Sequence, residues 1–229
     1  MACRLYEGKA HAASYWKYRI SPSEHLMKQV LNFCEGHRGG PFELAVDVGC
    51  GSGQGTLLLA KHFASVVGTD VSPAQIEMAL QHAKQPNVTY RLCAAEELPF
   101  ADSSADLVTA MSAFHWFDRP RFLLETHRVL KPRGCLALVN YTLDMELSYS
   151  DCCSHTLNQI CREFYAALHP YRNPILGPNS IYLYKEAFEA IPYPNKEWLM
   201  SVMKVTSAET DVMVAVKYFY LLACKPEEA

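Results

Sequence analysis

Four glycines directly after a short apolar segment are the strongest chemical signal in the sequence. They lie in Gly49–Gly55, immediately after Val46-Asp47-Val48. Glycines between a strand and a helix let the backbone turn tightly and approach a ligand closely. Their spacing fits neither a dinucleotide fingerprint, with glycines at the first, third and sixth places, nor a P-loop, which needs Gly-Lys-Ser/Thr. Asp47 would repel a pyrophosphate and attract an ammonium group, so we favour a nucleoside with a cationic amino-acid tail over a turn without a ligand.

A second carboxylate, Asp70, ends the next apolar run along the chain. A carboxylate in this place commonly accepts both hydroxyls of a ribose, because its two oxygens match a vicinal diol. The alternative is an aspartate that caps the following helix, but Ser72 already serves that purpose. We therefore expect Asp70 to bind a ribose.

Short apolar runs alternate with helix-like segments around these two carboxylates. We expect strands at residues 44–48, 65–69, 88–92, 106–111 and 135–140. Helices are expected at residues 22–34, 56–63, 73–84, 120–129 and 158–168, the first with Ser21 as its cap. The alternation predicts an α/β fold with a parallel sheet covered by helices on both faces. Ligands of such sheets bind at the carboxyl ends of the strands, where both carboxylates are expected.

The last third of the chain has a weaker pattern. Residues 169–181 are rich in proline and glycine and indicate a loop, and residues 186–191 and 198–203 are short, ambiguous pieces. The apolar stretch at residues 188–193 is typical of a core strand. Residues 212–216 and 218–224 also have the length and apolar character of strands.

The composition excludes several classes of protein. The 229 residues carry 21 basic and 24 acidic side chains, a formal charge of −3, and 50% of them are hydrophobic. This excludes wholesale disorder and disfavours a general nucleic-acid binder. The 9 cysteines form no Cys-x-x-Cys pair and the histidines no His-Glu-x-x-His motif, so we expect no metal site. No segment has the character of a signal peptide or membrane-spanning helix, so we expect a cytoplasmic protein with free thiols, Cys152 and Cys153 included.

Taken in order, five motifs resemble those of class I S-adenosylmethionine-dependent methyltransferases. They are residues 46–56, 67–72, 95–100, 106–118 and 128–134, and the resemblance covers roughly Tyr6 to Tyr141. Phe114-His115-Trp116-Phe117-Asp118 is similar to a narrower group, the trans-aconitate methyltransferase-like branch. The segment from Tyr6 to Arg19, with Tyr15 and Tyr18, resembles the one that closes over cofactor and substrate there. The resemblance implies a Rossmann-like, seven-stranded, mostly parallel sheet whose last, antiparallel pair is residues 212–216 and 218–224.

The resemblance also implies roles for individual residues around S-adenosylmethionine and its product S-adenosylhomocysteine. Gly49 and Gly51 would approach the methionine part of the cofactor, Asp47 would hold its amino group, and Asp70 would bind its ribose. The full set implied for the cofactor is Tyr18, Asp47, Gly49, Cys50, Gly51, Asp70, Val71, Ala95, Glu96 and Ser112. Many relatives carry an aspartate where this chain has Ala94, so the adenine would depend on backbone groups, on Glu96 or on stacking.

Two side chains are candidates for catalysis. His115 is either a donor or general base that faces the substrate, or a loop residue packed on Trp116 that only shapes the pocket. Arg19 can clamp a carboxylate of the substrate or the cofactor, or can be a solvated basic residue. The resemblance implies methyl transfer to a small molecule, at the oxygen of a carboxylate or hydroxyl. The acceptor would come into line with the sulfonium methyl.

We expect the whole chain to form one methyltransferase domain. Residues 1–40 would be the closing segment, 41–141 the cofactor-binding core, 142–211 a partial substrate lid and 212–229 the final strand pair. The stretch after the core is shorter than the branch implies, so an alternative is a catalytically weak or inactive cofactor-binding protein with a shortened lid. The expected partner is a small-molecule substrate, without nucleic acid or membrane, for a monomer or weak homodimer.

Overall fold

The computed structural model describes residues 6–19, 22–176, 178–206 and 212–227 and is built around a seven-stranded sheet. Its order is β3-β2-β1-β4-β5-β7-β6. The strands are β1 (Leu44–Val48), β2 (Ser65–Asp70), β3 (Val88–Leu92), β4 (Ala105–Met111), β5 (Leu130–Ser148), β6 (Asn195–Thr206) and β7 (Met213–Cys224). Strands β1 to β5 run parallel, while β7 pairs antiparallel with both β5 and β6. This confirms the predicted Rossmann-like α/β fold.

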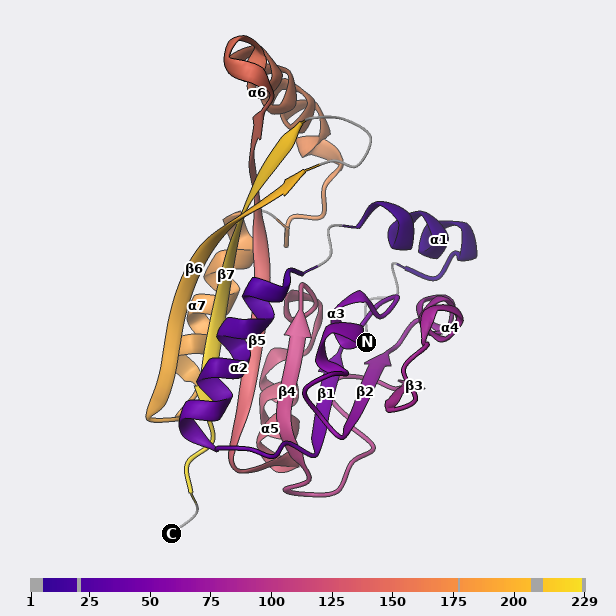
Figure 1. Cartoon of the computed structure of the whole chain (residues 1–229), viewed down its shortest axis with the longest axis vertical. Coiled ribbons are helices and arrows are strands. Elements are labelled where there is room, and N and C mark those ends of the chain that lie inside the picture. The colour runs from indigo at the N-terminus through magenta and orange to yellow at the C-terminus, as the bar shows by residue number, and fades with distance from the viewer. Residues whose placement is uncertain (1–5, 20–21, 177, 207–211, 228–229) are drawn as a thin grey trace.

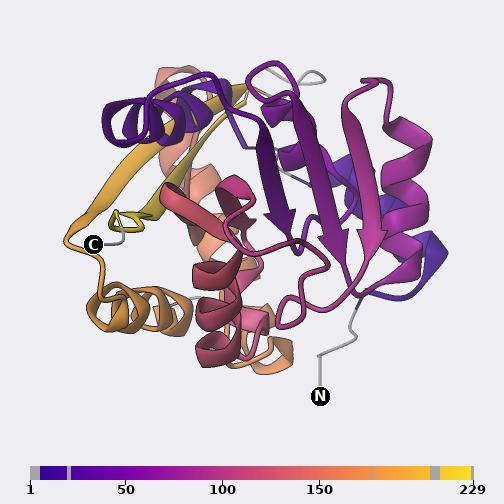
Figure 2. The same ribbon diagram turned by 90° about the horizontal axis from the view of Figure 1, so that it is seen from below.

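Helices cover both faces of the sheet (Figure 2). One face packs on α2 (Glu24–His37) and α3 (Gln54–Leu59), and the other on α5 (Arg119–Val129) and α7 (Pro178–Ala190). Each face of the sheet has its own hydrophobic core. Alternate residues of a strand pack into one core or the other, because successive side chains of a strand point to opposite faces. In β5, Ala137 belongs to the α2 side and Leu138 to the α7 side.

Two of the helices, α4 and α2, begin at a serine side-chain cap. The Ser72 hydroxyl accepts a hydrogen bond from the Gln75 backbone N–H at 3.3 Å, at the start of α4 (Pro73–His82). This confirms the predicted helix start. The first core helix differs, because Ser23, and not Ser21, caps α2, and its hydroxyl accepts from the Leu26 N–H at 3.1 Å. Ser21 lies outside the described residues.

The prediction that the sheet ends in an antiparallel strand pair is confirmed, but the residues assigned to that pair were wrong. Residues 212–216 and 218–224 are not two paired strands, because Met213–Cys224 forms the single strand β7. Its neighbour at the sheet edge is β6, which the ambiguous residues 198–203 only hinted at. Residues 188–190, predicted as strand, are instead the end of α7, whose Tyr184 and Ala187 pack into the core together with Ile191, the residue after the helix.

The last three strands of the sheet extend beyond its core. Strand β5 is 19 residues long and carries α6 (Ser150–Leu168) at its far end (Figure 1). The chain then returns through α7 and β6. At the opposite side of the sheet, α1 (Lys9–Tyr18) packs against α4. Helix α1 is thereby placed beside the carboxyl ends of the first strands.

Candidate active site

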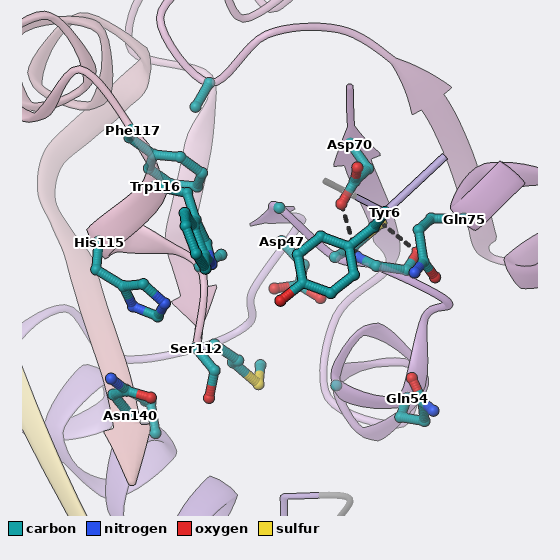
Figure 3. A pocket seen from close by; sticks show the side chains of 18 of the residues that line it. Tyr6, Asp47, Gln54, Asp70, Gln75, Ser112, His115, Trp116, Phe117 and Asn140 are labelled. Atoms are coloured by element: carbon teal, nitrogen blue, oxygen red, sulfur yellow. Dashed lines mark hydrogen bonds between the residues drawn. The ribbon is translucent and has the colours of Figure 1, made fainter. Parts of the chain in front are cut away.

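A pocket opens at the carboxyl ends of the central strands, where the strand order reverses between β1 and β4. Strand β1 leads into the glycine loop, β2 ends at Asp70, and Ser112 directly follows β4. Asn140 of β5 forms part of the opposite wall. Tyr15 of α1 and Leu176, just before α7, line the pocket as well. Figure 3 shows Asp47 and Asp70 on one side of this space and His115 and Asn140 on the other.

Asp47 organises the base of the glycine loop. It is 1% exposed, and its two carboxylate oxygens accept hydrogen bonds from the Thr56 hydroxyl at 2.6 Å and the Thr109 hydroxyl at 2.9 Å. Burial raises the pKa of Asp47 to about 6, although the two hydroxyl bonds act in the opposite direction. The residue lines the pocket, so its charge acts on a bound cation while both threonines fix its orientation.

Asp70 holds the glycine loop from the neighbouring strand. Its Oδ2 accepts from the Gly51 N–H and its Oδ1 from the Ser72 N–H, both at 2.9 Å. Burial raises the pKa of Asp70, while these backbone N–H groups lower it. Each oxygen keeps a second lone pair, so the carboxylate remains able to accept from a diol in the pocket.

The glycines of the loop serve different purposes. A Cβ at Gly49 would lie 2.5 Å from the Ala113 Cβ, and one at Gly53 would lie 2.4 Å from the Tyr90 hydroxyl, so packing alone requires glycine there. Gly51 has φ +54°, and a Cβ on it would meet nothing closer than 3.6 Å. Its missing side chain therefore leaves room in the pocket for a ligand that approaches the backbone.

The segment expected at the adenine lines one end of the pocket. Val71 and Ala95 contribute apolar surface, with Cys50 nearby, and burial raises the pKa of the Cys50 thiol well above its ordinary value. The Glu96 Oε1 accepts from the Asp118 N–H at 2.7 Å, so Glu96 also supports the loop that carries His115. Glu96 lines the pocket, and this bond leaves its other carboxylate oxygen free to accept a hydrogen bond.

The loop after β4 carries Ser112 and His115. Ser112 has φ +58° and donates its backbone N–H to the Val139 carbonyl at 2.7 Å, a left-handed conformation that is costly outside glycine. His115 is 3% exposed, and its Nδ1 has no hydrogen-bond partner in the described part of the chain. Burial, with help from the charge of Arg19, lowers the pKa of His115 to about 4. The imidazole is therefore neutral at pH 7.

Arg19 supplies a cation on the His115 side of the pocket. Its Nη1 donates to the Tyr141 hydroxyl at 2.6 Å, and its guanidinium carbon lies 5.1 Å and 5.0 Å from the ring centroids of Tyr15 and Tyr141. Within the described residues it forms no ion pair with a carboxylate. A guanidinium held in this way can bind an anion that enters the pocket.

The structure gathers every predicted site residue in one pocket except Tyr18. That side chain is 73% exposed and lies outside the pocket, whereas Tyr6 and Tyr15 line it. Sequence reasoning also missed Gln75 and Tyr141. Helical spacing offered a signal for Tyr15, because it stands four positions before Arg19 and so shares its side of the chain, but nothing local marked Tyr141.

Part of the chain is similar in sequence to proteins named as methyltransferases. Residues 46–138 match the family model described as methyltransferase domain. A methyltransferase-named protein of Dictyostelium discoideum is 40% identical over 130 residues, which are 57% of this chain and 47% of that protein. The malonyl-[acyl-carrier protein] O-methyltransferase of Hahella chejuensis is 39% identical over 104 residues, 43% of this chain and 37% of that protein. The chain thus spans about half or less of the length of these curated relatives.

The fold comparison agrees. The structure of a type II methyltransferase from Anaeromyxobacter dehalogenans superposes with a TM-score of 0.67 at 21% identity, over 92% of this chain and 100% of that one. Residues 46–138 are thus similar to a methyltransferase domain, and the described residues share the fold of solved S-adenosylmethionine-dependent methyltransferases. The open cradle at Gly51 and the carboxylates of Asp47 and Asp70 fit the ammonium and ribose of that cofactor.

Among the described residues, no cluster of three or more histidine, cysteine or acidic side chains could hold a metal ion. No helix in the described ranges is long and apolar enough to cross a membrane.

Proposed function

We propose that this protein transfers a methyl group from S-adenosylmethionine to an oxygen of an anionic small molecule, with a carboxylate as the preferred acceptor. The observation that carries the proposal is the Arg19 guanidinium, which faces the pocket without a carboxylate partner among the described residues. A half-buried cation without a counter-ion has lost part of its hydration, and an anionic acceptor supplies the counter-ion.

The distribution of charge in the pocket supports this choice. The carboxylates of Asp47 and Asp70 lie on the side of the glycine loop, opposite His115 (Figure 3). Arg19 lies on the other side, because it bonds to Tyr141 of β5 and lowers the pKa of His115. A cationic tail is therefore attracted to the glycine loop, and an anionic acceptor is attracted to Arg19.

The chemistry of this arrangement depends on position more than on proton transfer. When bound, S-adenosylmethionine supplies the methyl group on its sulfonium. Arg19 and Tyr141 would hold an acceptor carboxylate, and Ser112 and His115 would border the path of the methyl group. Holding the reactants in line supplies most of the rate acceleration. A carboxylate already carries its lone pairs and needs no general base, so a neutral His115 suffices as a hydrogen-bond partner or pocket wall.

The similarity to an O-methyltransferase adds support for oxygen as the atom methylated. The Hahella chejuensis relative is named as a malonyl-[acyl-carrier protein] O-methyltransferase, and its similarity is confined to 104 residues. We also propose that the protein belongs to the trans-aconitate methyltransferase-like branch, because the segment Phe114–Asp118 resembles that branch. We also propose a monomer or weak homodimer that acts in the cytoplasm on a small molecule, without nucleic acid, in keeping with its charge of −3.

A second candidate is a cofactor-binding protein with weak or absent turnover. One observation favours it: no described side chain of α6 lines the pocket, and the described residues after β5 contribute only Leu176, Ser180 and Tyr218. So few lining residues from this part of the chain give an acceptor few contacts that could hold it in line with the methyl group. Cofactor binding without turnover would then be the outcome.

Matched acceptors with one carbon skeleton test the proposal. The protein is incubated with S-adenosylmethionine and an aromatic or branched acid, its alcohol, its carboxamide or its amine, and release of S-adenosylhomocysteine is measured. The proposal predicts release with the acid and none with the amine. Turnover of the amine alone would contradict it, and binding of S-adenosylhomocysteine without turnover of any acceptor would favour the second candidate.

A further inference from the structure

Gln75 places an unpartnered amide oxygen in the wall of the pocket. The residue lies in the first turn of α4, and its side chain is 2% exposed. Its Oε1 makes no hydrogen bond to any described residue. The bond at the helix start involves the Gln75 backbone N–H and the Ser72 hydroxyl, so the side chain has no part in the cap. A buried acceptor without a donor destabilises the free protein, and this calls for a ligand that supplies the donor.

The Gln75 amide lies beside the carboxylate of Asp70, the residue proposed to bind the ribose. A Cβ at Gly51 would be 3.9 Å from the Gln75 Oε1, and the Gly51 N–H donates to the Asp70 Oδ2 at 2.9 Å. The amide oxygen and the carboxylate therefore flank the same glycine. Figure 3 shows Gln75 next to Asp70 and across the pocket from His115.

We propose that Gln75 is a cofactor-binding residue whose amide oxygen accepts a hydrogen bond from one ribose hydroxyl, while Asp70 accepts from the other. A ribose diol offers two donors. Both oxygens of Asp70 already accept one backbone N–H each, so a second acceptor at the same glycine allows the two hydroxyls to be shared. This inference rests on the proposed function, because it assumes that the pocket binds S-adenosylmethionine.

Two variants separate this role from a structural one. Gln75→Leu removes the amide at similar size, and Gln75→Met does so without branching. Gln81→Leu is the matched control, since Gln81 lies on the same helix with an exposed side chain. Because the Gln75 oxygen has no partner in the free protein, at least one of the two Gln75 variants keeps or raises the melting temperature. Both nevertheless bind S-adenosylhomocysteine about tenfold more weakly than the parent, while Gln81→Leu binds it normally.

Deoxy analogues identify the contact. Calorimetric titrations use S-adenosylhomocysteine and its 2′-deoxy and 3′-deoxy analogues. For one of the two analogues, the parent loses about tenfold in affinity, and the Gln75 variants show no further loss with that analogue. Any of three results would overturn the inference. The Gln75 variants lose the same affinity for all three ligands, they bind S-adenosylhomocysteine as well as the parent does, or both have lowered melting temperatures. If the folded parent binds no S-adenosylhomocysteine, the cofactor assignment itself fails, and the inference fails with it.

Discussion

The guanidinium of Arg19 and the hydroxyl of Tyr141 form a 2.6 Å hydrogen bond between residues 122 positions apart in the sequence. This contact joins the segment that follows α1 to the strand β5. It positions the cation before any substrate enters, since the rings of Tyr15 and Tyr141 already flank it. The contact that fixes the segment after α1 on β5 therefore also places the cation that would bind an anionic acceptor.

Removal of the Arg19 charge tests its assignment to the acceptor. In Arg19→Met, KM for a carboxylate acceptor should rise about 10- to 100-fold, because a charge-assisted hydrogen bond is lost. Affinity for S-adenosylhomocysteine should change less than about twofold. Steady-state kinetics and calorimetry measure the two effects. Lys17→Met, on the exposed side of α1, is the control. A loss of cofactor affinity in Arg19→Met as large as the rise in its KM for the acceptor would refute the assignment.

Asp47 predicts a pH dependence of cofactor binding. Its pKa, raised to about 6 by burial, means that the carboxyl is protonated at pH 5 and ionised at pH 7. Because a bound ammonium favours the ionised form, affinity for S-adenosylhomocysteine should rise about three- to tenfold from about pH 5 to about pH 7. Titrations with 5′-methylthioadenosine, which lacks the amino-acid tail, should show no such rise. A rise of the same size with both ligands would assign the effect to another group.

The raised pKa of Asp47 also has a consequence for stability. The folded protein holds this proton more tightly than the unfolded chain, whose aspartate titrates near its ordinary 3.8. Ionisation therefore lowers the free energy of unfolding as the pH rises through about 4 to 6. In Asp47→Asn, urea denaturation should show less of this decline than the parent. An unchanged pH dependence in the variant would argue against a raised pKa.

The lowered pKa of His115 predicts that the pH dependence of kcat/KM shows no histidine titration near neutral pH. Its pKa of about 4 keeps the imidazole neutral, so kcat/KM for a carboxylate should be flat for this group from about pH 5.5 to 8. His115→Gln should lower kcat with a carboxylate by less than about tenfold. A hydroxyl acceptor that needs a general base would lose about 100-fold or more in the same variant. A loss of that size with a carboxylate would make His115 a catalytic base after all.

A buried charge cluster at the opposite end of the sheet predicts a large effect on stability alone. Asp106 is fully buried, accepts from the Glu43 and Leu44 N–H groups at 2.7 and 2.8 Å, and pairs with Arg38 and Lys131. Asp106→Asn should lower the free energy of unfolding by about 3–5 kcal/mol, because it breaks a buried pair. Urea denaturation measures the loss.

Asp102→Asn is the control for that variant. Asp102 is 78% exposed and pairs with Arg128, so its loss should cost less than about 1 kcal/mol. Burial raises the pKa of Asp106, but the bonds from Leu44 and Glu43 and the nearby cations outweigh it, so its pKa is lowered. The stabilisation is therefore present near neutral pH and is lost in acid. Similar losses in the two variants would contradict this description of Asp106.

Local patterns in the sequence were sufficient for the parallel half of the fold. The glycine loop, Asp70 and the Ser72 cap each depend on neighbours within a few residues, and all were found where expected. The last strand was divided in two because Lys217 interrupts an apolar run. In the structure Lys217 sits within β7 and pairs with Glu146 of β5 at 3.2 Å, a long-range contact that no local pattern contains.

The same distinction holds for the site. Asp47 could be placed from its motif, but its partner Thr109 lies on another strand, 62 positions away. Tyr141 and Gln75 join the pocket only because β5 and α4 bring their ends together, and their own neighbourhoods mark them as ordinary strand and helix residues. Tyr18 was assigned to the site by the resemblance of its segment to a closing segment, but it is exposed to solvent, whereas Tyr15 lines the pocket.

The most direct test of the cofactor site is calorimetric titration of S-adenosylhomocysteine into the parent and into Asp70→Ala. Circular dichroism first establishes that both proteins are folded. The account predicts that the parent binds one molecule per chain, and that the variant binds at least about tenfold more weakly because the ribose loses its carboxylate. A folded parent that does not bind S-adenosylhomocysteine, or a variant that binds it as tightly as the parent, would contradict the account.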